Sequence, residues 1–128
     1  MTIELFTLCD GAYNYNGKLT IVGALSSINV NKLPVKVQMG VAMRIRVEAG
    51  EAGSRQLRVR FVSPEGKDIP TDLVVDVNLE PTEELSYISL AASIQGMQIS
   101  QTGQYAVKVL MGDEEMSEYP FVVNQKSS

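Results

Sequence analysis

The sequence predicts an all-β protein, an antiparallel, immunoglobulin-like β-sandwich of seven to nine strands. Apolar and polar residues alternate with a period of two nearly everywhere, which indicates half-buried strands. Turn residues separate these runs, and no helical periodicity of any length interrupts them. The alternation favours antiparallel sheets, because the strands of parallel sheets are usually continuous apolar runs.

The first two predicted strands form a hairpin. Residues 3–9 alternate, and Asn16-Gly17 follows them. This pair is the strongest two-residue hairpin signal, because both residues tolerate positive φ. The second strand covers residues 18–24 and can continue to Val30.

Further strands follow the same pattern, separated by turns rich in Gly, Pro and Ser. They cover residues 37–48, 55–63, 73–80, 87–94, 105–111 and 116–123. The length of 128 residues fits one domain spanning 1–128. Within it, residues 36–124 form the sandwich core, and residues 1–33 are either an added N-terminal hairpin or the first strand plus an extension.

Tyr105 occupies a position typical of immunoglobulin-like sandwiches. It begins the penultimate predicted strand, where a tyrosine corner ties its hydroxyl group to a nearby backbone group. The alternative is an ordinary amphipathic tyrosine at the edge of the core. The Cys…Trp…Cys pattern of antibody domains is absent.

Four segments carry a family resemblance: ELFTLCD at 4–10, NGKLTIVGALSSI at 16–28, RIRVEAGEAGSRQLRVRFVSPEGKDI at 44–69 and TGQYAVKVL at 102–110. They resemble a family of small bacterial proteins of uncharacterised function. The resemblance implies a stand-alone β-sandwich and a bacterial, cytoplasmic setting. It implies no activity and carries over no catalytic residues.

The residues missing from this sequence exclude several kinds of chemistry. Without histidine there is no Ser-His-Asp or Cys-His catalytic device. One cysteine and no histidine cannot hold structural zinc or an iron–sulfur cluster, so we expect no metal and no cofactor. Cys9 is followed by Asp10, and we expect its thiol to be buried and inert. The sequence therefore predicts no catalytic residues and no enzyme.

The N-terminal segment and the charge bear on location and partners. MTIELFTLCD lacks the basic start of a secretory signal, and no stretch is long and apolar enough to cross a membrane. We therefore expect a cytoplasmic protein with no membrane partner. The net charge of −4 also argues against nucleic-acid binding, which needs a basic surface.

Clustered arginines are the unusual feature of the chain. If residues 37–48 and 55–63 pair as an antiparallel hairpin, matching their apolar faces sets Arg44 opposite Arg60 and Arg46 opposite Arg58. Four guanidinium groups would then share one outward face and repel by about 0.8 kcal/mol per facing pair.

Two arrangements would offset that repulsion. In the first, acidic neighbours pair with the arginines: Glu48 on the same face, or Asp76 and Glu80 on an adjacent strand. In the second, the arginines bind an anion or an acidic partner surface, because guanidinium forks match carboxylate and phosphate groups. The second alternative makes Arg44, Arg46, Arg58 and Arg60 a candidate binding site.

Phe6 and Leu8 fall on the face of the first strand that should point outward. Either another part of the chain covers them or they form a homodimer interface. On these grounds the function predicted is that of a non-enzymatic binding or interaction module that uses a sheet face or edge. The alternative is a structural or assembly protein that acts through homo-oligomerisation, and an enzyme of unrecognised type comes third.

Overall fold

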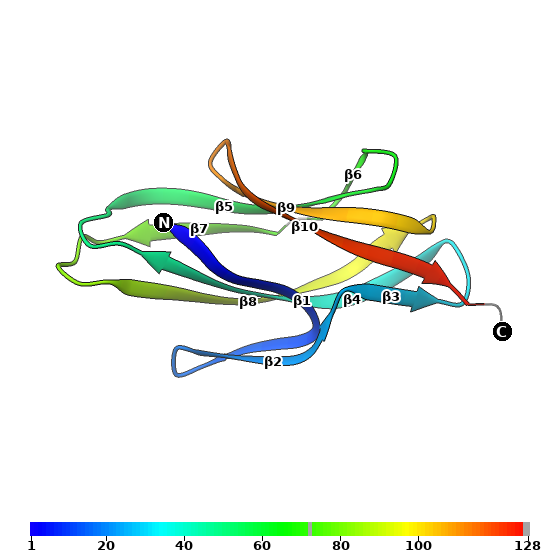
Figure 1. Ribbon diagram of the computed structural model, residues 1–128, viewed down its shortest axis with the longest axis horizontal. Helices are drawn as coiled ribbons and strands as arrows, with labels where there is room; N and C mark the ends of the chain where they lie inside the picture. Colours follow the sequence, from blue (N-terminus) through cyan, green and yellow to red (C-terminus); the bar gives the residue numbers. More distant parts are fainter. Residues whose placement is uncertain (72, 127–128) are drawn as a thin grey trace.

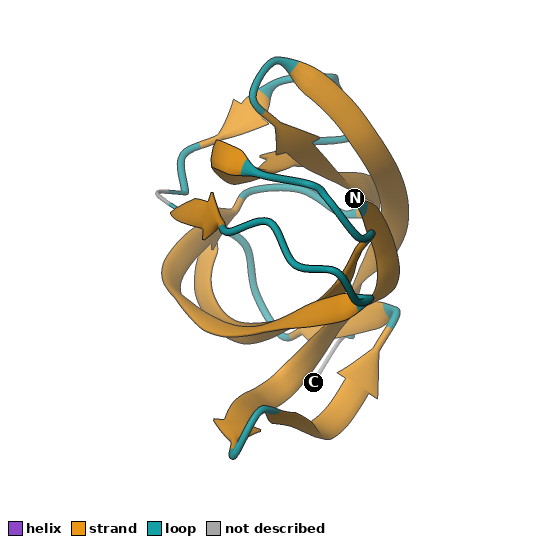
Figure 2. Cartoon of the chain, turned by 90° about the vertical axis from the view of Figure 1, so that its left-hand side faces the viewer, coloured by secondary structure: helices purple, strands orange, loops and turns teal. Residues whose placement is uncertain are grey.

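The computed structural model describes residues 1–71 and 73–126, which form ten strands packed in two sheets (Figures 1 and 2). The strands are β1 (Thr2–Tyr15), β2 (Lys18–Leu25), β3 (Ser27–Val30), β4 (Val35–Val47), β5 (Gly53–Val62), β6 (Asp68–Ile69), β7 (Val74–Leu79), β8 (Ser86–Ile99), β9 (Gly103–Met111) and β10 (Glu114–Gln125). The described residues include no helix with the length and hydropathy needed to cross a membrane.

One sheet, sheet A, has the strand order β2-β1-β4-β8. The other, sheet B, has the order β3-β10-β9-β5, and both β6 and β7 pair with the far side of β5. All pairs are antiparallel except β3 with β10. The predicted antiparallel sandwich is confirmed. The strand number exceeds nine because β3 and β6 have four and two residues, too few for alternation to reveal them.

The N-terminal segment belongs to the sandwich itself. Residues Thr2 to Cys9 of β1 pair with Gly40 to Arg46 of β4, so β1 lies inside sheet A. The prediction that residues 36–124 form the sandwich core is wrong, because residues 1–33 supply β1 to sheet A and β3 to sheet B and add Leu8 and Val30 to the core. The predicted Asn16-Gly17 turn is also confirmed, since both residues have positive φ (50° and 77°) and Tyr15 pairs with Lys18 across them.

Beyond Cys9, the β1–β2 hairpin folds back over the outer face of sheet A, and Figure 1 shows β2 beneath the sandwich. Small residues allow this close approach: an added Cβ at Gly40 would lie 3.2 Å from the Ala12 nitrogen. Asn14 Nδ2 donates a hydrogen bond to the Ser89 carbonyl oxygen at 3.0 Å, which ties the hairpin tip to β8. The hairpin therefore covers part of sheet A and buries Cys9 completely.

The core lies between the two sheets. Odd-numbered residues of β4 and β5 face it, including Val41, Met43 and Ile45 on one side and Leu57, Val59 and Phe61 on the other. Each such side chain contributes about 1.5–3 kcal/mol by leaving water. The even-numbered residues of the same strands point outward, and this alternation sets the positions of the arginines.

Candidate functional site

The predicted arginine hairpin is wrong. β4 pairs with β1 and β8 in sheet A, whereas β5 pairs with β9, β6 and β7 in sheet B. Arg44 and Arg46 thus lie on the outer face of one sheet and Arg58 and Arg60 on the outer face of the other. Alternation tells which residues of each strand face inward, but it does not distinguish a hairpin from a connection that crosses between sheets. The four guanidinium groups share no face.

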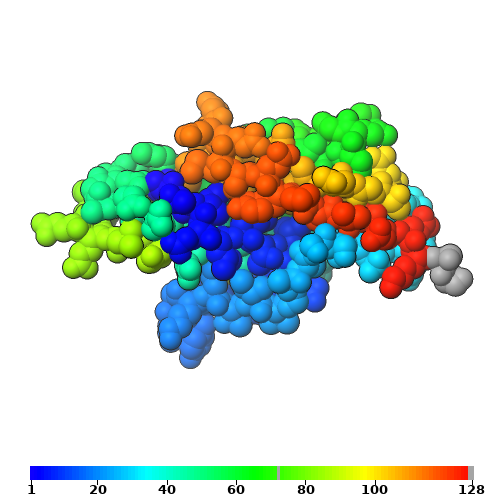
Figure 3. All heavy atoms as spheres, viewed as in Figure 1, coloured from blue at the N-terminus to red at the C-terminus, as the bar shows by residue number. Residues whose placement is uncertain are grey.

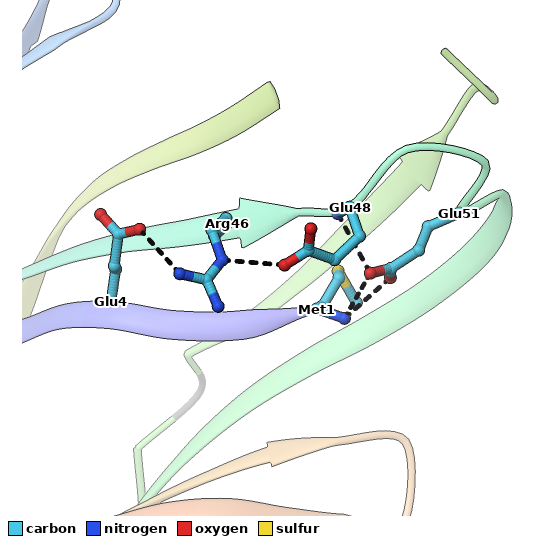
Figure 4. Close-up of polar contacts among 5 residues, drawn as sticks. All are labelled: Met1, Glu4, Arg46, Glu48 and Glu51. Carbon is cyan, nitrogen blue, oxygen red and sulfur yellow. Dashed lines mark hydrogen bonds and ion pairs between the residues drawn. The ribbon is translucent and has the colours of Figure 1, made fainter. Parts of the chain in front are cut away.

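Arg44 and Arg46 are paired within the chain. Glu4 of β1 lies 2.9 Å from Arg44 Nη2. Glu4 also lies 3.7 Å from Arg46 Nη1, and Glu48 accepts a hydrogen bond from Arg46 Nε at 2.9 Å (Figure 4). Glu48 was one of the predicted partners. Glu4 was missed because the sequence did not reveal that β1 neighbours β4. Exposed pairs of this kind contribute at most about 1 kcal/mol each.

Next to this cluster, the N-terminal amine of Met1 donates hydrogen bonds to both carboxylate oxygens of Glu51, at 2.6 and 2.8 Å (Figure 4). The Glu48 backbone N–H donates to the same carboxylate. These bonds, the amine's first, lower the pKa of Glu51 because they favour its ionised form. The contact fastens the start of β1 to the loop between β4 and β5.

The outer face of sheet B carries the other two arginines. Arg60 Nη2 lies 2.7 Å from both carboxylate oxygens of Asp68, and Arg58 Nη2 lies 3.5 Å from Gln56 Oε1. Both line an open hollow of about 380 Å³ beside β6. Among the described residues, neither Asp76 nor Glu80 forms an ion pair with an arginine. Arg44, Arg46 and Arg60 thus form ion pairs within the chain. Of their partners, Glu48 was predicted from the sequence, whereas Glu4 and Asp68 were missed.

Phe6 and Leu8 point into the sandwich, contrary to the predicted outward orientation. The irregularity between Ile3 and Leu5 shifts the register of β1, so that Phe6 and Leu8 turn toward sheet B. Phe6 stacks on Tyr119 of β10 with ring centroids 4.4 Å apart, and Leu8 is 5% exposed. Of the two alternatives, cover within the chain is the one observed, and these residues do not form an exposed homodimer surface.

Exposed apolar side chains lie on the β1–β2 hairpin and at the start of β8. Tyr13 and Tyr15, 60% and 71% exposed, share the outward face of the β1–β2 hairpin with Val22. Figure 3 shows this hairpin standing out beneath the rest of the molecule. Leu85 and Tyr87, at the start of β8, are also about half exposed. The predicted pattern placed Tyr13 and Tyr15 in a connection and gave no sign of this surface.

β8 has a backbone edge that nothing in the described chain pairs with. It is the last strand of sheet A and pairs only with β4. Its other hydrogen bonds to the chain are made at Ser89, with Asn14 and Gly17 of the β1–β2 hairpin. From Ser86 to Ile94 its register with β4 is unbroken, and a bulge at Gln95 and Gly96 ends this straight part. Between Leu85 and Val107 the sequence contains no Asp, Glu, Lys or Arg.

The hairpin turn determines which backbone groups of β8 are unpaired. A two-residue turn closes on a hydrogen-bonded pair, so Tyr15 and alternate residues back to Cys9 bond to β2, and Leu8 and Phe6 bond to β4. The alternation continues in β4, so the odd-numbered residues of β4 bond to β1 and its even-numbered residues bond to β8. The even-numbered residues of β4 lie opposite odd-numbered residues of β8, which are therefore the ones that bond to β4. The backbone groups of Ile88, Leu90 and Ala92 therefore face the open side.

An apolar slot of about 20 Å³ runs beside this edge, between the two sheets. Its lining includes Leu90 and Ala92 of β8 and Val75 of β7, together with Leu73, which precedes β7. The slot holds about one water molecule and is too small for an ordinary ligand. It is nevertheless an apolar surface next to unpaired backbone groups.

The other outer strands are short, charged or interrupted. β3 has four residues, β6 has two and is followed by Pro70, and β7 has six including Asp76. β2 has Lys18 as its first residue and is interrupted by Gly23, whose φ is 67°. Short length, charge and proline are the devices that protect natural sheet edges from pairing with other chains. The straight part of β8 has none of them, and this makes its edge the candidate functional site.

No group of three or more His, Cys, Asp or Glu side chains within residues 1–71 and 73–126 is placed to hold a metal ion. Cys9 is buried as predicted, and burial, with the charge of Asp10, raises the pKa of its thiol. A raised pKa disfavours the reactive thiolate.

The alkylpurine DNA glycosylase AlkC of Pseudomonas fluorescens, solved bound to DNA containing an abasic site analog, is similar to this chain with a TM-score of 0.46 and 12% sequence identity. The similarity covers 93% of this chain and 30% of the glycosylase chain, so this chain spans about a third of that protein's length. Residues 4–124 match the model of a family of unknown function, DUF6941. Because the match covers nearly the whole sequence, the chain belongs to the DUF6941 family.

Proposed function

We propose that this protein is a non-enzymatic binding module that takes up an extended protein strand at the free edge of β8. The observation that carries the proposal is the straight, uncharged edge from Ser86 to Ile94. Of the other outer strands, β3 and β6 are short, β7 carries Asp76, and β2 begins with Lys18 and is interrupted by Gly23 at a φ of 67°. Added strands bind through main-chain hydrogen bonds, and neighbouring pockets select their side chains.

The chemistry of the edge indicates the kind of partner. Backbone groups of Ile88, Leu90 and Ala92 supply donors and acceptors for an antiparallel or a parallel strand. The apolar slot between Leu90 and Leu73 favours apolar side chains on the inward face of that strand. No basic residue lies on β8 to contact phosphates, so the proposed partner is a protein segment and not a nucleic acid.

A displayed library of random ten-residue peptides tests this function. The wild-type protein, immobilised sparsely to keep its copies apart, is expected to enrich peptides of alternating polarity. Binding should be lost in Ala92→Lys, whose long charged side chain does not fit the slot and would obstruct the edge beside it, and kept in Val22→Lys on the exposed face of the hairpin.

The proposal is wrong if the enriched peptides bind Ala92→Lys as well as they bind the wild type. It is also wrong if neither a library peptide nor a second copy of the protein occupies the edge. Circular dichroism and thermal unfolding of both variants show that a loss of binding is not a loss of the fold.

A further inference from the structure

We infer that the occupant of the β8 edge is the β8 edge of a second copy, paired antiparallel across a two-fold axis. This inference rests on the proposed use of the edge and names its partner. It joins two copies of sheet A, each with β8 as its last strand, into one continuous sheet.

The absence of charge fits self-pairing. In an antiparallel pair of identical strands, a charge near the two-fold axis faces a like charge, which is unfavourable. β8 and its flanks contain no charged residue from Leu85 to Val107, so no register of the two strands opposes like charges. A strand specialised for a different partner would be expected to carry charges complementary to that partner.

The charges beyond the strand favour the antiparallel direction. Glu83 and Glu84 precede β8, and Lys36 of β4 lies opposite Gln98 near its other end. Antiparallel pairing brings the acidic end of one copy beside the end of the other copy that carries Lys36. Parallel pairing would place the two acidic ends together.

The unpaired backbone groups also set the register. They belong to even-numbered residues, so a hydrogen-bonded pair across the interface joins two even-numbered residues. The register that uses the whole straight part, from Ser86 to Ile94, places Leu90 on the two-fold axis, with Ile88 facing Ala92 of the other copy. This arrangement forms about ten backbone hydrogen bonds and covers the apolar slot on both copies.

The pairing closes after two copies. Each copy has one straight, uncharged edge. An isologous contact pairs this edge of one copy with the same edge of the other, so no such edge remains free. The bulge at Gln95 and Gly96 ends the pairing, and the β1–β2 hairpin covers the outer face of sheet A nearby. The product is therefore a dimer and not a fibre.

Sedimentation velocity over a range of concentrations tests the inference. We expect the wild type and Val22→Lys to dimerise, and Ala92→Lys to associate about 100-fold more weakly, because its ammonium group would be buried without a partner charge. Ala92→Pro is the second variant. The proline removes the N–H of residue 92, which faces the open side, and leaves the β4–β8 hydrogen bonds in place. The variant protein should therefore also be monomeric.

Amide hydrogen exchange by NMR checks the interface itself. Exchange at Ile88, Leu90 and Ala92 should slow about tenfold or more as the protein concentration rises, whereas Ser89 and Ala91, already bonded to β4, should change little. A protein that stays monomeric at millimolar concentration overturns the inference. So does a dimer that Ala92→Lys leaves intact, or one whose edge amides exchange at the monomer rate.

These outcomes separate the inference from the proposed function. A strict monomer that still binds library peptides at the β8 edge refutes self-pairing alone. A strict monomer that binds no peptide there refutes both.

Discussion

The hydroxyl group of Tyr105 donates a hydrogen bond of 2.6 Å to the backbone carbonyl oxygen of Gln101, four residues earlier. This is the tyrosine corner that the position of Tyr105 at the start of β9 predicted. The ring is 2% exposed and stacks on Phe121 with centroids 5.2 Å apart. One residue thus joins the core to the turn before β9.

Replacing Tyr105 with Phe should destabilise the protein by about 1–2 kcal/mol, because the variant loses the bond and leaves the Gln101 carbonyl group without it. Urea unfolding measures the change, and Tyr13→Phe on the exposed hairpin face should alter stability by less than about 0.5 kcal/mol. Equal stability of Tyr105→Phe and the wild type would show that the corner contributes nothing.

Burial of the Tyr105 side chain also makes the free energy of unfolding depend on pH in the alkaline range. It raises the pKa of Tyr105 above its value in the unfolded chain. The contribution of Tyr105 is therefore fully present below the unfolded pKa, about 10, and is lost as pH rises through the folded value. The difference in free energy of unfolding between the wild type and Tyr105→Phe should therefore shrink as pH rises from the unfolded pKa of Tyr105 through its folded pKa.

Phe6 and Tyr119 join the two sheets on the side opposite β7 and β8. Their rings are nearly parallel, at 10°. A double-mutant cycle of Phe6→Leu and Tyr119→Leu should give a coupling energy of about 0.5–1.5 kcal/mol. Oligomeric state should be the same in all four proteins, because both rings face each other within one chain. A coupling energy near zero, or a loss of dimer in Phe6→Leu, would contradict this account.

Gly40 lets the β1–β2 hairpin lie against sheet A. An added Cβ would lie 3.0 Å from Cys9 Sγ and 3.2 Å from the Ala12 nitrogen, with little room to move because Cys9 is fully buried. Gly40→Ala should destabilise the protein by about 1–3 kcal/mol. Ser93→Ala, at the residue paired with Gly40 on β8, is the control and should have little effect. Unchanged stability in Gly40→Ala would mean that the hairpin does not lie this close.

The fold could be predicted from the sequence because its evidence is local. Alternation in β4 or β5 depends only on which side chains face the core, and the Asn16-Gly17 turn needs only its own backbone angles. These features gave the strand positions, the first hairpin and the all-β class.

The candidate site could not be predicted in the same way, because it depends on which strands are neighbours. Arg46 and Arg58 lie on different sheets, and the sequence between them does not encode the crossing. The bulge near Glu4 reverses the sides of Phe6 and Leu8, and no turn residue marks it. The β8 edge becomes visible only when β4 is seen as its single neighbour, although its lack of charge was present in the sequence throughout.

Glu51 should make stability depend on acidic pH. Its pKa is lowered, first by the hydrogen bonds from the Met1 amine and then by the Glu48 N–H. A lowered folded pKa means that the contribution is present above the unfolded value, about 4.3, and is lost as pH falls through the folded value. Glu51→Gln should therefore be less stable than the wild type at neutral pH, and the difference should disappear in acid.

Unfolding of both proteins by urea between pH 7 and pH 2 measures this difference. Glu65→Gln is the matched control, since Glu65 is exposed and its one ion pair, with Lys67, is long at 3.8 Å. Its stability should follow that of the wild type at every pH. A Glu51→Gln variant whose stability runs parallel to that of the wild type across the acid range would show that the amine and this carboxylate do not interact in solution. The start of β1 would then depend only on its pairing with β4.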